Sequence, residues 1–85
     1  MSNSTIATDP LTDFLVQYVS YCAMVEVTKK DLVPEAMRNA IDMATIALDN
    51  VWEAYRLCKE ANIPLETIRS RMTATVPEYA NMALV

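Results

Sequence analysis

The stretch that decides the fold is PEAMRNAIDMATIALDNVWEAYRLCKEAN, residues 34–62. After its first residue it contains neither proline nor glycine, and proline is well tolerated at the first position of a helix. At a rise of 1.5 Å per residue, a helix of this length measures about 42 Å, which is long for a chain of 85 residues. We therefore predict one long central helix over about residues 34–62, with the rest of the chain folded around it.

Apolar side chains repeat along this helix at alternating spacings of four and three residues, and alanines recur every seventh residue beside them. The first set occupies heptad positions a and d: Met37, Ile41, Ala44, Leu48, Val51, Tyr55 and Cys58. The second set occupies position g: Ala40, Ala47, Ala54 and Ala61. Such a pattern is typical of helices that pack side by side, and a row of alanines allows a close approach.

We interpret this pattern as a surface for self-association. The residues expected to form it are Ala40, Ile41, Ala44, Ala47, Leu48, Val51, Ala54 and Tyr55. The same row of side chains can instead pack against another helix of the same chain, and the sequence does not separate the two cases. Trp52, Met43 and Leu57 lie outside this row, so the long helix needs more than one neighbour to cover its apolar surface.

The flanking segments predict further helices. Asp9-Pro10 is a helix start in which Asp9 caps the free N–H groups, and it opens a helix over about residues 10–27. Val33 precedes a proline and is therefore expected to be extended. Ile63-Pro64 ends the long helix, and one or two short helices follow. We expect an all-α fold, a helical hairpin or small bundle, with residues 1–8 as a flexible tail and residues 9–85 as a single domain.

The amino acids that are missing exclude most enzyme classes. The chain has no glycine and no histidine. Glycine-rich phosphate loops and the G-x-S-x-G nucleophile elbow are therefore excluded, as are histidine-dependent triads and zinc sites of the H-E-x-x-H type. No pair of carboxylates, tyrosines or cysteines is distinguished by its spacing. We expect a protein that is not an enzyme and that has no cofactor and no metal site.

Cysteine usage and hydropathy indicate the compartment. Cys22 and Cys58 stand among apolar residues at helical spacing, which is typical of buried, reduced thiols in a cytosolic protein. The longest apolar stretch without a charge, residues 14–25, is too short to span a bilayer. The first residues do not have the pattern of a signal peptide. We expect a cytoplasmic protein that does not associate with membranes.

Residues 54–71 are similar in pattern to a helix-turn-helix motif for DNA binding. Cys58 stands where such motifs carry a small residue, Asn62 where they often carry glycine, and Ile63 and Ile68 at apolar positions that follow. The side chains that would contact nucleic acid or another partner are Arg56, Lys59, Thr67, Arg69 and Arg71. However, Arg71 falls where the motif requires an apolar residue. A net charge of −4 also provides little attraction for phosphates.

Two other patterns have alternative interpretations. Acidic residues recur on one side of the long helix at Glu35, Asp42 and Asp49 and on another at Glu53 and Glu60, either as a solvated surface with helical ion pairs or as a stripe that meets a basic partner. The second pattern is a group of five side chains that could line a small-molecule or nucleotide pocket between helices. They are Tyr18, Tyr21, Trp52, Tyr55 and Arg56.

The function most compatible with these features is non-enzymatic protein binding. We expect an adaptor, regulator or stoichiometric inhibitor that forms a homodimer or higher oligomer and binds another protein rather than nucleic acid. The small, acidic, helical profile is typical of such regulators, among them those that phages and mobile elements encode. This is an analogy of type, which assigns no site.

Overall fold

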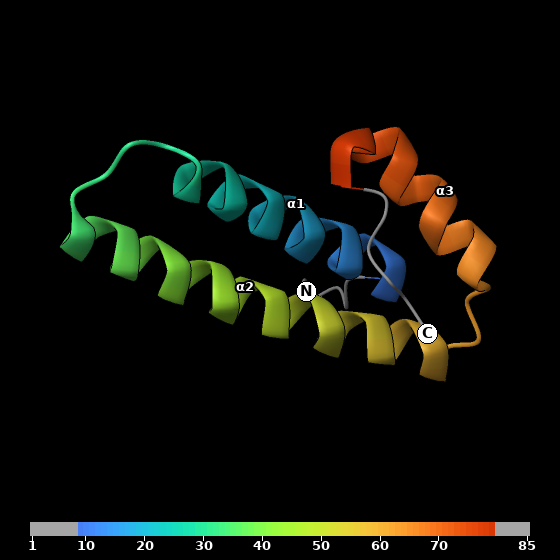
Figure 1. Ribbon diagram of the computed structural model, residues 1–85. Coiled ribbons are helices and arrows are strands. Elements are labelled where there is room, and N and C mark those ends of the chain that lie inside the picture. The colour runs from blue at the N-terminus through green and yellow to red at the C-terminus, as the bar shows by residue number, and fades with distance from the viewer. Residues whose placement is uncertain (1–8, 80–85) are drawn as a thin grey trace, which may run out of the picture.

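The computed structural model describes residues 9–79, and these form three α-helices and a short 3-10 helix. Helices α1 (Pro10–Thr28) and α2 (Pro34–Glu60) form an antiparallel hairpin. Helix α3 (Leu65–Thr75) lies at the end of the hairpin that is farther from the α1–α2 loop, and η1 (Pro77–Tyr79) follows it (Figure 1). The predicted all-α hairpin with a long central helix is confirmed. The expectations for residues 1–8 and for residues 80–85 lie outside the described part of the chain.

The helices begin where the sequence predicts. Asp9 caps α1 by accepting a hydrogen bond from the backbone N–H of Thr12 at 3.2 Å, and Pro10 is the first helical residue. Val33 is extended, with ψ of 154°, and Pro34 opens α2. The proline fixes this boundary because its ring disfavours a helical conformation in the residue before it.

Helix α2 ends two residues earlier than predicted, in a Schellman motif. The N–H of Ile63 donates to the carbonyl of Cys58 at 3.0 Å, and the N–H of Asn62 donates to the carbonyl of Lys59 at 3.0 Å. This motif requires a left-handed residue after the helix, and Asn62 provides it with φ of 62°. The resulting turn directs the chain into α3.

The core lies where α1, α2 and α3 meet. Its largest fully buried side chains are Tyr18, Phe14, Ile68, Met72, Val51 and Cys58. The ring of Phe14 contacts those of Tyr18 and Tyr55, each at 6.2 Å between centroids. The hydroxyl of Tyr18 donates a hydrogen bond to the carbonyl of Val76 at 2.7 Å. This bond attaches the end of α3 to the middle of α1.

Candidate protein-interaction surface

The alanine row of α2 is directed into the chain's own core. Ala40, Ala47 and Ala54 are buried, and in the described structure α1 is the element that packs along α2. Ala61, at the end of the row, is exposed. The alanines therefore have a close neighbour, as the pattern indicates, but this neighbour is α1 of the same chain.

Five of the eight residues expected to mediate self-association have little surface left for a second chain. Ala40, Ala47, Val51, Ala54 and Tyr55 are all buried within the single chain. The residues of α2 at heptad positions a and d are called here the heptad seam. Three of them, Val51, Tyr55 and Cys58, belong to the core cluster that also contains Ile68 and Met72 of α3. The half of the heptad seam that lies farther from the α1–α2 loop is thus buried in a core that α1, α2 and α3 form together. That these five residues form an intermolecular surface stays a prediction, for which the single chain leaves little exposed area.

The remaining three residues line a small groove near the α1–α2 loop. Ile41 is exposed, and Ala44 and Leu48 are half-buried. Together with side chains of α1 they line a groove of about 230 Å³, called here the seam groove. Its residues are Tyr21, Val25, Thr28, Ile41, Ala44, Thr45 and Leu48. Self-association through α2 remains a prediction, for which this half of the seam leaves more exposed area.

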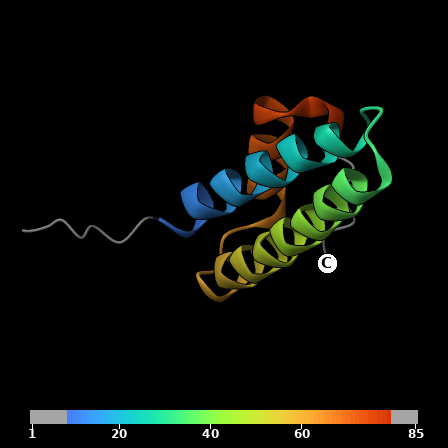
Figure 2. The same ribbon diagram turned by 90° about the vertical axis from the view of Figure 1, so that its left-hand side faces the viewer.

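Helix α1 presents an uncovered surface that has few charges. Of its 19 residues only Asp13 and Glu26 are charged, so it is apolar nearly all round. A helix of this composition is normally buried on all sides. Figure 2 shows that α1 has α2 on one side and α3 on another, while the rest of its surface has no neighbour in the described structure. Val16 and Val19 are consequently 56% and 42% exposed.

Two grooves flank this uncovered side of α1. The outer groove, about 500 Å³, lies between α1 and the end of α3. It is lined by Thr12, Leu15, Val16, Val19, Ser20 and Thr75. The methionine groove, about 280 Å³, lies between α1 and α2. It is lined by Gln17, Ser20, Ala23, Met24, Met43, Ile46, Ala47 and Asn50.

Ser20 belongs to both grooves, so they form one continuous surface, called here the α1 surface. None of its lining residues is charged. Among the described residues eight large hydrophobic side chains are exposed, and four of these lie on the α1 surface: Val16, Val19, Met43 and Ile46. The centre of a protein interface is typically depleted in charged residues and enriched in methionine. The α1 surface has this composition.

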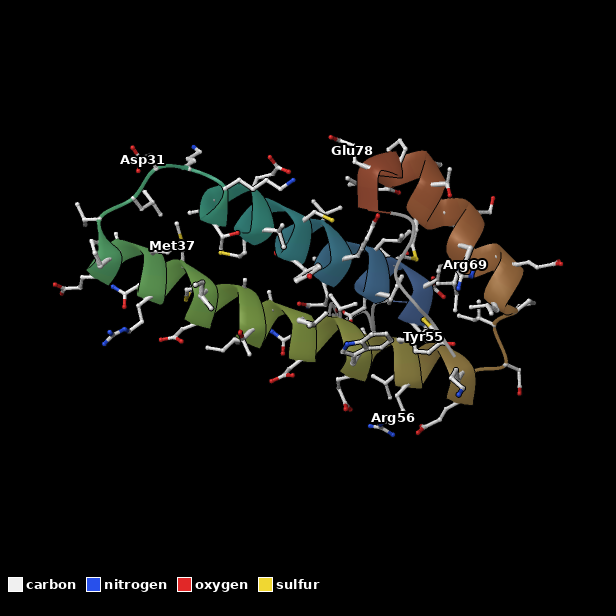
Figure 3. The ribbon with its side chains drawn as sticks, viewed as in Figure 1. Asp31, Met37, Tyr55, Arg56, Arg69 and Glu78 are labelled. Atoms are coloured by element: carbon white, nitrogen blue, oxygen red, sulfur yellow. The ribbon has the colours of Figure 1, made fainter. Side chains whose placement is uncertain are left out.

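Charged side chains gather instead on the outer side of α2. The guanidinium of Arg56 forms ion pairs with Glu53 and Glu60, and it points away from the other helices (Figure 3). Its hydrogen bond and its charge lower the pKa of Glu53. Both are helical ion pairs of the kind expected for a solvated surface. Glu35, Asp42 and Asp49 are exposed, as a solvated surface requires.

The helix-turn-helix pattern is matched in the turn but not throughout α3. Asn62 adopts the left-handed conformation that the glycine position of the motif requires, and Ile68 is buried. Arg71 is exposed, and the next residue, Met72, is buried in its place. Thr67 is exposed, and Arg69 is half-buried on the side of α3 nearer to the hairpin (Figure 3). The five expected contact residues therefore do not share one exposed surface, because Arg56 lies on the outer side of α2.

The five residues considered for a ligand pocket are not gathered in one cavity. Tyr18 is fully buried, and Tyr21 lines the seam groove. Trp52, Tyr55 and Arg56 do share a hollow of about 410 Å³ with Lys59 and Glu60. In it the Trp52 and Tyr55 rings meet edge to face at 5.9 Å, and the Lys59 ammonium lies 5.7 Å from the centre of the Tyr55 ring.

Both cysteines are buried in the core as free thiols. The Cys58 thiol donates to the carbonyl of Pro10 at 3.3 Å, and burial raises the pKa of both thiols. Within residues 9–79 no group of three or more potential ligand side chains is placed to hold a metal ion. The thiols of the described structure therefore act as core side chains.

Neither a protein-family model, nor a curated protein sequence, nor a solved structure has significant similarity to this chain. Over the described part of the chain, no helix has the combination of length and hydrophobicity needed to cross a membrane.

The sequence interpretation missed the uncovered side of α1. In the sequence, residues 14–25 stand out as a stretch without charge that is too short for a membrane span. The signal that identifies the surface is that a stretch three helical turns long without a charge has no charged side to turn toward water. Heptad analysis of α2 does not detect it, because the surface lies on the other helix.

Proposed function

We propose that this chain is a non-enzymatic protein-interaction module, an adaptor, regulator or inhibitor that acts by binding protein through the α1 surface. The observation that carries the proposal is that α1, a helix with two charged residues, is covered on only part of its circumference. Leaving Val16, Val19, Met43 and Ile46 in water has a free-energy cost, because burying a side chain of this size stabilises by about 1.5–3 kcal/mol. A protein partner removes this cost.

The seam groove supports the proposal less strongly than the α1 surface. It is smaller, and Ile41 is its single strongly exposed hydrophobic side chain. The hollow beside Trp52 is bordered by three charged residues, Arg56, Lys59 and Glu60. We therefore place partner binding on the α1 surface and not at these two sites.

Photo-crosslinking in cells tests this proposal. A photoreactive phenylalanine analogue is introduced at Val16, on the α1 surface, and separately at Val33, which is 68% exposed in the α1–α2 loop. We expect a discrete cross-linked protein species from position 16 and none from position 33. Equal labelling from both positions, or no discrete species from position 16, would exclude the α1 surface as the binding site.

A further inference from the structure

We draw no further inference here: the strongest candidate, the hollow on α2 where Trp52, Tyr55 and Lys59 meet, has its one arginine already paired with two glutamates, and nothing in the structure shows what covers it.

Discussion

Asn62 makes the turn between α2 and α3 with a backbone conformation that most residues avoid. It has φ of 62°, and among residues 9–79 no other residue that is not glycine has a positive φ. The left-handed conformation costs an ordinary residue about 1–2 kcal/mol, and asparagine tolerates it better than most. This chain therefore uses asparagine where a helix usually ends with glycine.

The first prediction concerns this residue. We expect Asn62→Ala to lower the free energy of unfolding by about 1 kcal/mol, because alanine has a Cβ atom and no local hydrogen-bonding group to offset the conformation. Asn62→Gly should be neutral or stabilising. Urea unfolding followed by circular dichroism measures both. A glycine variant that is as unstable as the alanine variant would mean that the amide side chain, and not the backbone conformation, matters here.

Tyr18 provides a prediction on pH dependence. Burial, with a further contribution from Cys22, raises the pKa of Tyr18 to about 12. An unfolded tyrosine loses its proton near pH 10. Between about pH 10 and pH 12 the folded state therefore binds more protons than the unfolded state, and stability decreases as the pH rises. Below pH 10 the contribution is fully present.

Tyr18→Phe is the matched variant for this prediction. Without the hydrogen bond to Val76, we expect it to be less stable than the wild type by about 1 kcal/mol at neutral pH. Its loss of stability between pH 10 and pH 12 should be shallower. The raised pKa values of Cys22 and Cys58 act in the same direction in both proteins. Parallel curves of unfolding free energy against pH would remove Tyr18 as the cause.

At the scale of elements, the chain's own packing decides which side of α2 is buried. The alanine row lets α1 approach closely, and the half of the heptad seam farther from the α1–α2 loop is buried in the core that the three helices share. A pattern that is typical of pairing between chains therefore serves mainly within one chain. Overpacking the alanine row should thus disturb folding before it disturbs assembly.

We expect Ala54→Leu to destabilise the fold by about 1–3 kcal/mol, since Ala54 is 3% exposed and has no room for three more carbon atoms. Ala61→Leu, in the same row but exposed, is the control and should change the melting temperature little. Thermal unfolding compares them. An Ala54→Leu protein with wild-type stability and a lower oligomeric mass would return the alanine row to an intermolecular interface.

The ends of the helices are easier to predict from the sequence than the contacts between the helices. Asp9-Pro10 and Val33-Pro34 mark helix starts through local chemistry, and both are found where expected. The sequence predicts the end of α2 at about Asn62, whereas the helix ends at Glu60, because the capping turn also has helical spacing. Which side of α2 packs on α1 depends on contacts between residues that are distant in the sequence. The sequence alone does not show whether the side with Ala47 or the side with Leu48 faces α1. The uncovered side of α1 is identified only once α2 and α3 have taken their places.

At the scale of the whole molecule, charge and hydrophobic surface are separated. The α1 surface has no charged lining residue, whereas acidic residues lie along the outer side of α2. The net charge is −4, and Arg56 is occupied by two glutamates. This distribution favours contact with protein over contact with phosphate.

We therefore expect no binding to a random DNA duplex at low salt, where nonspecific affinity is strongest. An electrophoretic shift assay tests this. Should a salt-sensitive shift occur and disappear in the double variant Arg69→Ala/Arg71→Ala, α3 would be a nucleic-acid contact and the protein-binding account would need revision.

The most direct test of the α1 surface places the photoreactive phenylalanine analogue at Val19 in three proteins: the wild type, Val16→Glu and Val33→Glu. Val16 and Val33 are both more than half exposed, so neither substitution should unfold the chain, and only position 16 lies on the surface. We predict a discrete cross-linked species in cells for the wild type and for Val33→Glu, and its loss for Val16→Glu. A Val16→Glu protein that keeps this species would contradict the account.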